Sequence, residues 1–198
     1  MTKREYLEHL FQKHGILSVQ DVEDEGVGSV YFSRLCAEGM IDRIGHGVYS
    51  CPAYASSEHI SYVEATKVVP RGVVCLSSAL KFHGLTLENP HRLDLAIPKG
   101  SRIPKHELPL NVYHFSPASY AFGITSVDTR DGRIQVYSVE KTIADCFKFR
   151  HEIGLNVAIA ALKEAKEKHL LQQDHLWEAL TVCRVARVAR PYLEGLYV

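Results

Sequence analysis

The segment from residue 18 to residue 52 constrains the fold of this chain most, because capping residues and glycines divide it into very short elements. Ser18 and Ser29 are of the type that caps helix N-termini, and Gly26 and Gly39 are placed to end the helices that follow them. We expect a strand, a tight turn and a returning strand next, over residues 40–44, 45–47 and 48–50. Two short helices followed at once by a hairpin are compatible with few folds.

A longer helix precedes this segment. Thr2 and Glu5 have the spacing of a capping box, and Gly15 is placed to end the helix. Its apolar residues recur at helical spacing and form one face: Tyr6, Leu7, Leu10 and Phe11. Three helices and a hairpin in this order are typical of the winged helix-turn-helix, a fold that mainly binds DNA. The sequence therefore predicts a binding protein rather than an enzyme.

The helix that begins near Ser29 has two different faces. Its apolar positions are expected to pack on the preceding helices: Tyr31, Phe32, Leu35 and Cys36. The opposite face carries Ser29, Val30, Ser33, Arg34 and Ala37. In a helix-turn-helix this face enters the major groove, so Ser29, Ser33 and Arg34 are predicted DNA contacts, with Arg34 the strongest candidate. The alternative is that Arg34 is an ordinary solvated arginine on a surface helix.

Two side chains near the tip of the predicted hairpin can also face a nucleic acid. Arg43 and His46 lie close to the turn, whereas Ile41, Ile44 and Val48 can face the core. The hairpin tip of this fold usually meets the DNA backbone or the minor groove, so Arg43 and His46 are predicted DNA contacts. A plain hairpin with an incidental histidine is the alternative.

The charge of the N-terminal segment opposes simple DNA binding. The whole chain has 23 lysines and arginines against 23 aspartates and glutamates, but residues 1–51 carry five basic and eight acidic side chains, a net charge of −3. DNA affinity comes largely from the neutralisation of phosphates by Lys and Arg. An acidic module must therefore depend on a local basic edge, or on basic residues elsewhere in the chain.

Cysteine content and hydropathy indicate the environment of the protein. The chain has 198 residues and five cysteines that are far apart in the sequence. This spacing, without a Cys-x-x-Cys pair, predicts reduced thiols and no zinc site. No apolar run reaches the about 18 residues of a membrane span, and the polar N-terminus does not resemble a signal peptide. We expect a soluble cytoplasmic protein with no cofactor, no metal and no membrane contact.

Residues 53–198 are predicted to form a second domain after a winged helix-turn-helix domain over residues 1–52. Apolar or alternating stretches indicate strands at 73–76, 92–97, 111–115, 124–129 and 133–137. Helical patterns cover residues 56–69, 77–83, 117–122, 138–149, 155–169 and 174–188. We therefore expect an α+β protein, whose second domain combines a small mixed sheet with a helical C-terminal tail.

Two basic clusters lie in the predicted second domain. One occupies a loop rich in proline and glycine and contains Lys99, Arg102, Lys105 and His106. The other recurs every third residue on the last predicted helix, at Arg184, Arg187 and Arg190. We assign Lys99, Arg102 and Lys105 to DNA and the three arginines to a partner protein, although either cluster could contact DNA phosphates or an acidic protein surface. Both could also be ordinary solvated surfaces.

Support for catalysis in the sequence is weak. Asp94 is alone on its predicted strand, and a nuclease of the restriction type would need an acid where Ile97 stands. Glu140 and Asp145 are five residues apart on one helix, which suits capping and surface pairing better than a shared metal ion. His83, before a glycine, is interpreted as a partly buried, hydrogen-bonded histidine. No P-loop, H-E-x-x-H or G-x-S-x-G motif is present, so we predict no catalytic residue.

Several blocks of the sequence resemble one known family. The N-terminal blocks are Arg34-Leu35, Gly39, Ile41, Arg43-Ile44 and Gly47-Val48-Tyr49. The later blocks are Ser77-Ser78-Ala79-Leu80, His83-Gly84-Leu85, Leu93-Asp94-Leu95-Ala96-Ile97-Pro98 and Val139-Glu140-Lys141-Thr142-Ile143-Ala144-Asp145. In order and spacing they resemble AbiEi-type antitoxins. These proteins are the transcriptional regulators of type IV toxin–antitoxin systems, which act in abortive infection, a form of phage defence. The resemblance covers roughly residues 5–165.

This resemblance implies a protein with two functions. The N-terminal domain would bind double-stranded DNA at its own promoter and repress its operon, and the second domain would neutralise a nucleotidyltransferase-type toxin. Repression would use two copies on an inverted repeat or cooperative monomers, so a monomer or a weak dimer is expected. The competing hypothesis is a winged-helix interaction module whose acidic N-terminal domain binds a protein and no DNA. A metal-dependent nuclease or nucleotidyltransferase is the third hypothesis.

Overall fold

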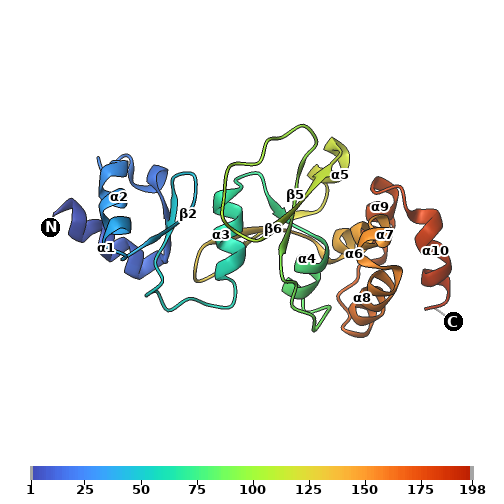
Figure 1. Cartoon of the computed structure of the whole chain (residues 1–198). Helices are drawn as coiled ribbons and strands as arrows, with labels where there is room; N and C mark the ends of the chain where they lie inside the picture. The colour runs from blue at the N-terminus through green and yellow to red at the C-terminus, as the bar shows by residue number, and fades with distance from the viewer. Residues whose placement is uncertain (1, 197–198) are drawn as a thin grey trace. The chain divides into compact units, whose positions relative to one another are not determined.

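The computed structural model describes residues 2–196, and Figure 1 gives the order of the elements along the chain. The residues group into two compact units. The N-terminal unit contains the chain up to Gly72 together with two later segments, Arg102–Pro109 and Val127–Ile134. The C-terminal unit contains the other described residues. The domain boundary between residues 52 and 53 that the sequence predicts stays a prediction.

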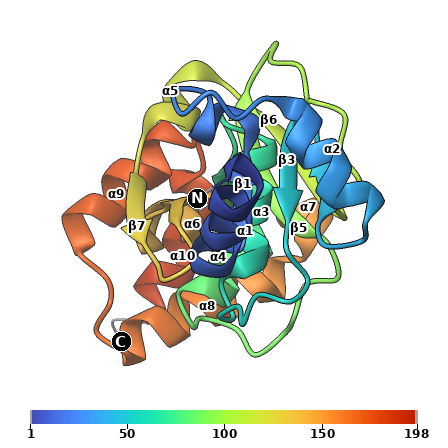
Figure 2. The ribbon, with the colours of Figure 1, turned by 90° about the vertical axis from the view of Figure 1, so that its left-hand side faces the viewer.

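The N-terminal unit combines helices with a small antiparallel sheet (Figures 1 and 2). Its elements are α1 (Lys3–His14), β1 (Ile16–Ser18), the 3₁₀ helix η1 (Val19–Val22), α2 (Ser29–Ala37), β2 (Asp42–Gly45), β3 (Val48–Ser50) and α3 (Ile60–Val68). The three strands have the order β1–β3–β2, and both neighbouring pairs are antiparallel. The α+β class predicted from the sequence is confirmed.

The capping residues set the beginnings of the first two helices as predicted. Thr2 and Ser18 each form a complete capping box, with Glu5 and Asp21 as the reciprocal partners. The helix expected over 18–26 is shorter, however, because it consists of one 3₁₀ turn. Ser18 also ends β1, a strand that the sequence did not predict because its three residues are defined only by pairing with β3.

Helix α2 differs from its prediction at its first turn. Gly28 occupies the N-cap position and makes no side-chain hydrogen bond, so the prediction that Ser29 caps the helix is wrong. Ser29 is instead the first helical residue, and its carbonyl oxygen accepts a hydrogen bond from the Ser33 hydroxyl at 3.1 Å. The hydroxyl of Ser33 therefore bonds to the helix backbone, although the residue is exposed.

Aromatic rings form the centre of the N-terminal core. The Phe32 ring of α2 meets Phe11 edge-on with centroids 6.0 Å apart, and it lies 4.9 Å from the ring of Tyr49. The same core contains Leu7, Phe11, Leu17, Val22, Val27, Phe32, Leu35, Ile41 and Tyr49. Burial of a side chain such as Phe32 contributes roughly 2 kcal/mol. Phe32 and Leu35 hold α2 as predicted, whereas Tyr31 and Cys36 are only half-buried.

The β2–β3 hairpin closes over His46 and Gly47. Gly47 has a φ of +68°, which glycine adopts without strain. Gly45 is needed for another reason: a Cβ atom added there would lie 2.8 Å from a methyl carbon of Val68 on α3. The hairpin therefore packs directly on α3, and β2 begins at Asp42 instead of residue 40.

Segments far apart in the sequence hold the chain that follows β3. The Ser57 backbone N–H and hydroxyl both donate to the buried carboxylate of Asp131. The guanidinium of Arg130 lies 6.0 Å from the centre of the Tyr54 ring. That ring leaves room only for glycine at position 15, where φ is +72°. These contacts explain why α3 begins at Ile60, four residues later than predicted.

A mixed five-stranded sheet follows the N-terminal elements. Its strands are β4 (Val73–Val74), β5 (Leu93–Pro98), β6 (Leu110–Phe115), β7 (Ile124–Asp128) and β8 (Arg133–Tyr137), in the order β6–β5–β4–β8–β7. β4 pairs antiparallel with β5 and parallel with β8, and β5 pairs parallel with β6. The mixed sheet is thus confirmed, although β4 is shorter than predicted.

The remaining helices are α4 (Leu76–Phe82), α5 (Pro117–Ala121), α6 (Val139–Lys148), α7 (Arg150–Ile153), α8 (Leu155–Glu167), α9 (Gln173–Val182) and α10 (Ala186–Glu194). Helix α6 is central, because α4, α8 and α9 all pack against it. The single last helix predicted over 174–188 is wrong. Arg184 has a left-handed backbone with a φ of +59°, which interrupts the α-helical hydrogen bonding between α9 and α10.

Candidate nucleic-acid interface

Helix α2 presents a face of small side chains and one cation. Ser29, Ser33, Arg34 and Ala37 are exposed, and Val30 is 60% exposed. Among the residues that the structure describes, Arg34 makes no ion pair. Arg34 and its neighbour Arg4 line a shallow hollow with Tyr31 and Leu35. The predicted contact face of this helix is therefore open to an approaching ligand.

Arg4 lies beside Arg34 but differs in its bonding. Its guanidinium donates to both carboxylate oxygens of Glu38, at 3.1 and 2.7 Å, and to Glu8 at 2.8 Å. The hydrogen bonds to Glu8 and Glu38 raise the pKa of Arg4 above its ordinary value. Because two carboxylates already match the charge of Arg4, Arg34 is the better candidate for binding an external anion or base edge.

The basic loop of the sequence extends the β2–β3 hairpin. Gly45 forms an antiparallel bridge with His106, and the Glu107 backbone N–H donates to the Ile44 carbonyl oxygen at 3.3 Å. These bonds are made within the N-terminal unit, to which residues 102–109 belong. The structure thus joins two predicted groups of DNA contacts that are about sixty residues apart in the sequence.

A cleft of about 160 Å³ lies between the hairpin and the loop; we name it the basic cleft. Its lining residues are Arg43, Gly45, His46, Lys105, His106 and Glu107. The Arg43 Nε–H donates to the Gly45 carbonyl oxygen at 3.2 Å, which directs the guanidinium along the hairpin. The lining contains one arginine, one lysine and two imidazoles against one carboxylate. An acidic N-terminal segment can bind DNA only through a local basic edge, and this cleft is such an edge.

The other predicted members of the basic loop are separated by the structure. Arg102 is exposed in the same segment of the N-terminal unit. Lys99 is exposed just after β5 and belongs to the C-terminal unit. His106 was named from the sequence only as a member of the basic loop, and Glu107 was not predicted. Only the backbone pairing with β2 identifies them, and a loop sequence without alternation gives no signal of such pairing.

Acidic side chains surround the start of α2. Glu23, Asp24 and Glu25 are exposed in the turn that precedes it. Asp21 is bound to Lys67 of α3 at 2.6 Å. Burial alone would raise the pKa of Asp21, but hydrogen bonds from Lys67 and Ser18 hold this pKa below its ordinary value. The three carboxylates of the turn face solvent and are expected to repel phosphates there.

The C-terminal arginines lie on two elements instead of one helix. Arg184 is in the loop between α9 and α10, whereas Arg187 and Arg190 are on α10, and all three are exposed. Arg190 pairs with Glu194 at 2.8 Å. Exposure leaves these side chains available to a partner, but the spacing argument that placed all three on one helix is wrong.

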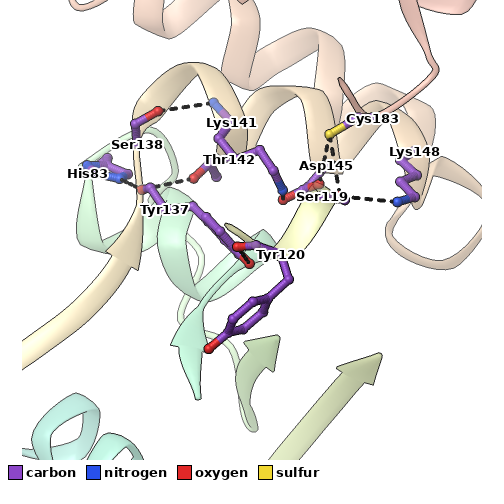
Figure 3. Close-up of polar contacts among 10 residues, drawn as sticks. All are labelled: His83, Ser119, Tyr120, Tyr137, Ser138, Lys141, Thr142, Asp145, Lys148 and Cys183. Atoms are coloured by element: carbon purple, nitrogen blue, oxygen red, sulfur yellow. Dashed lines mark hydrogen bonds and ion pairs between the residues drawn. The ribbon is translucent and has the colours of Figure 1, made fainter. Parts of the chain in front are cut away.

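A buried polar cluster lies around α6 in the C-terminal unit (Figure 3). Lys141 and Asp145 form an ion pair on α6, and both side chains are completely buried. The Lys141 ammonium lies 4.1 Å from the centre of the Tyr137 ring and 4.7 Å from that of Phe115. Burial raises the pKa of Asp145, and the charge of Lys141 opposes this effect. Asp145 is therefore part of the core, and its predicted role in surface pairing is wrong.

Other groups complete the hydrogen bonding of this cluster. The Cys183 thiol donates to the second oxygen of Asp145 at 3.3 Å, and burial raises the pKa of Cys183 to about 12. The Tyr137 hydroxyl donates to the Tyr120 carbonyl oxygen at 2.9 Å, and the Thr142 hydroxyl donates to the Tyr137 carbonyl oxygen at 3.3 Å (Figure 3). A neutral, enclosed thiol is a weak nucleophile. The cluster thus serves packing and orientation of α6.

Asp94 has a structural role at the start of α4. Its buried carboxylate accepts hydrogen bonds from the backbone N–H groups of Ser77 and Ser78 and from the Asn111 amide at 3.0 Å. Burial raises the pKa of Asp94, and these hydrogen bonds lower it. Asp94 therefore caps α4 from a neighbouring strand, and Cys75 takes the N-cap position.

Two further residues considered for catalysis are bonded within the fold. The His83 ring Nε2 lies 2.7 Å from the Tyr137 carbonyl oxygen, and burial lowers the pKa of His83. A Glu140 oxygen accepts a hydrogen bond from the Gln172 backbone N–H at 3.0 Å, at the start of α9. Within residues 2–196, no group of His, Cys, Asp and Glu side chains has a metal-binding arrangement. No helix in the same range has the length and apolar character needed to cross a membrane.

Comparison with known proteins identifies the N-terminal segment. Residues 5–52 match the family model of the AbiEi antitoxin transcriptional regulators. The AbiEi-type resemblance found in the sequence is thus confirmed for the segment that contains α2 and the β2–β3 hairpin. The later blocks lie outside the matched residues. No curated protein sequence matches the chain.

A solved structure shares the fold of most of this chain. It is the crystal structure of the Rv2827c protein from Mycobacterium tuberculosis, with a TM-score of 0.63 and 11% sequence identity. The match covers 91% of this chain and 72% of the Rv2827c chain. At this identity the match shows a common fold, and it carries no conclusion about activity or partners.

Proposed function

We propose that this chain is a sequence-specific DNA-binding repressor that is also the antitoxin of a type IV toxin–antitoxin system. In this proposal the N-terminal residues form a winged helix-turn-helix, with α2 as the recognition helix and the β2–β3 hairpin as the wing. The observation that carries the proposal is the basic cleft, in which residues 102–109 add Lys105 and His106 to the wing residues Arg43 and His46.

Charge supports this assignment. Phosphate neutralisation supplies most of the sequence-independent affinity of a DNA-binding protein. Arg43 and Lys105 would each neutralise a phosphate beside the groove, and Arg102 is exposed in the same loop. Ser29, Ser33 and Arg34 would face the bases, because a recognition helix lies in the major groove. Lys99 remains a proposed phosphate contact from the C-terminal unit.

The antitoxin part of the proposal concerns the C-terminal unit. We assign the exposed Arg184, Arg187 and Arg190 to the binding of an acidic surface on a nucleotidyltransferase-type toxin. The DNA target would be the promoter of the operon that encodes both proteins. The proposal contains no catalytic step, because Asp94 and Asp145 are each bonded within the fold.

The direct test measures binding of the full chain to the DNA upstream of its gene. Fluorescence anisotropy reports the binding, and scrambled DNA serves as the competitor. We expect binding that resists the competitor and weakens with salt. The Arg34→Ala variant is expected to lose roughly 5- to 150-fold in specific affinity, the usual range for a lost bidentate base contact. Lys13→Ala, which removes an exposed charge from the end of α1, is the matched control and should bind normally.

A second function is favoured by one observation, the exposed acidic turn at residues 23–25. These carboxylates would suit a basic protein surface, so the N-terminal unit would then be a protein-interaction module. This alternative predicts no preference for upstream DNA even at low salt. Equal binding of upstream and scrambled DNA would therefore overturn the repressor assignment.

A further inference from the structure

We infer that Val30 and Arg34 recognise two bases of one operator half-site, a thymine and a guanine about two base pairs apart. This inference rests on the proposed function, because it assumes that α2 lies in the major groove. It adds the base composition of the target and names Val30 as a residue that determines specificity.

Val30 is the unusual residue on the contact face of α2. It lies in the first turn of the helix, where recognition helices approach the base edges, and it is 60% exposed. Its neighbours on this face are small: Ser29, Ser33 and Ala37. A valine side chain has no hydrogen-bonding group, so it can distinguish one base from another only through apolar contact. The thymine 5-methyl group is the apolar feature of the major groove.

Rigidity favours the same role for Val30. A β-branched side chain has one strongly preferred rotamer in a helix, so its two methyl groups hold a fixed position without loss of further entropy on binding. Covering this exposed valine with a methyl group also removes apolar surface from water. The small neighbouring side chains allow the helix backbone to come close enough for that contact.

Arg34 supplies the second contact. It follows Val30 by four residues, which places the two side chains on the same helix face. Its guanidinium makes no ion pair within the described residues, unlike that of Arg4. The O6 and N7 atoms of guanine are acceptors that match the fork of donors on arginine. A guanine is thus the base that Arg34 would select.

The spacing of the two bases follows from helix geometry. Four residues of an α-helix rise about 6 Å, and successive base pairs are about 3.4 Å apart. A recognition helix that runs along the groove therefore places Val30 and Arg34 over bases about two steps apart. The predicted half-site contains a thymine and a guanine separated by about one intervening pair.

Base analogues test this inference on the full chain. After the bound site has been mapped in the upstream DNA, each thymine is replaced in turn by deoxyuridine, which lacks only the 5-methyl group. Each guanine is replaced by 7-deazaguanine, which lacks the N7 acceptor. We expect one deoxyuridine position per half-site to weaken binding about fourfold, the value for one buried methyl-sized group. A 7-deazaguanine about two pairs away should weaken binding more strongly.

Variants assign each effect to its residue. Val30→Ala should bind the thymine and deoxyuridine duplexes equally, and Arg34→Ala should lose sensitivity to 7-deazaguanine. Alanine favours helix more than valine does, so the first variant is expected to fold. Met40→Ala removes another exposed apolar side chain from the same unit and should keep both sensitivities. Two results would overturn this inference and leave the proposed function standing. One is specific binding of the parent chain that no deoxyuridine weakens, and the other is a Val30→Ala variant as sensitive to deoxyuridine as the parent chain. Absence of any preference for the upstream DNA would overturn the proposed function as well.

Discussion

Lys141 is a charged residue whose side chain is completely buried in the C-terminal unit. Its ammonium is fully buried between the Asp145 carboxylate and the rings of Tyr137 and Phe115. Removing two charges from water costs several kcal/mol per ion, and the mutual attraction of the pair only offsets that cost. The pair is thus held in place by the fold around it, and removal of one partner leaves the other buried without compensation.

This environment predicts a large difference between single and double variants at residues 141 and 145. We expect Lys141→Met to lower the free energy of unfolding by about 3–5 kcal/mol, because Asp145 is then a buried, unpaired carboxylate. Lys141→Met combined with Asp145→Leu should recover most of the loss. Urea unfolding followed by circular dichroism measures both. A double variant no more stable than Lys141→Met would contradict the idea that an unpaired, buried Asp145 causes the loss.

The Asp21–Lys67 pair predicts a pH dependence in the N-terminal unit. The pKa of Asp21 is lowered by folding, so its carboxylate stabilises the folded state above its unfolded pKa of about 3.9. This contribution is lost as the pH falls through the lower, folded pKa. Asp21→Asn should therefore be less stable than the parent chain at neutral pH, with a difference that shrinks toward about pH 3. The urea midpoints at the two pH values provide the measurement, and a constant difference would contradict this assignment.

At the scale of elements, α2 and the β2–β3 hairpin carry the proposed interface, and the turn before α2 opposes it. The turn presents Glu23, Asp24 and Glu25 to solvent shortly before α2, the proposed recognition helix. Repulsion between these carboxylates and phosphates acts on every DNA sequence equally. The acidic turn would therefore suppress binding to non-cognate DNA and leave base contacts to decide which site is bound.

Neutralising the turn tests that role. The triple variant Glu23→Gln, Asp24→Asn and Glu25→Gln should bind upstream and scrambled DNA several-fold more tightly, with little change in the ratio of the two affinities. The effect should be largest at low salt, where charges are screened least. Competition anisotropy with upstream and scrambled duplexes gives both affinities. Unchanged binding to scrambled DNA would place the turn away from the phosphates.

The elements differ in how well the sequence predicts them, for physical reasons. The caps at Thr2 and Ser18 are local, so side-chain type and spacing were sufficient to predict them. Strand β1 and the bridge at His106 depend on pairing with distant segments, and local patterns contain no trace of them. The break at Arg184 was missed because nothing in residue type marks a left-handed arginine.

At the scale of the whole molecule, the basic cleft is the feature that composition could not predict. The sequence placed Arg43 and Lys105 in separate predicted domains, and the net charge of residues 1–51 is −3. Folding brings residues 102–109 to the hairpin and concentrates basic side chains there. The sequence predicted Arg34, Arg43 and Lys105 as individual contacts. Their DNA roles stay predictions, and only the structure supplies the pairing that joins Arg43 with Lys105.

The fold comparison concerns the backbone of the molecule and not its surface charges. A common fold with the Rv2827c protein persists at 11% identity over 91% of this chain. A match at this identity shows a common fold and gives no information on surface charges. Surface features such as the basic cleft must therefore be tested on this chain itself.

The salt dependence of DNA binding tests the central claim most directly. The affinity of the parent chain for upstream DNA is measured across a series of salt concentrations, beside Arg43→Ala/Lys105→Ala and the control Lys13→Ala. Each lost phosphate contact changes the slope of log affinity against log salt by about 0.9. We predict that the double variant has a slope less negative by about 1.8, with the control unchanged. If the double variant had the slope of the parent chain, the claim that Arg43 and Lys105 of the basic cleft contact DNA phosphates would be contradicted.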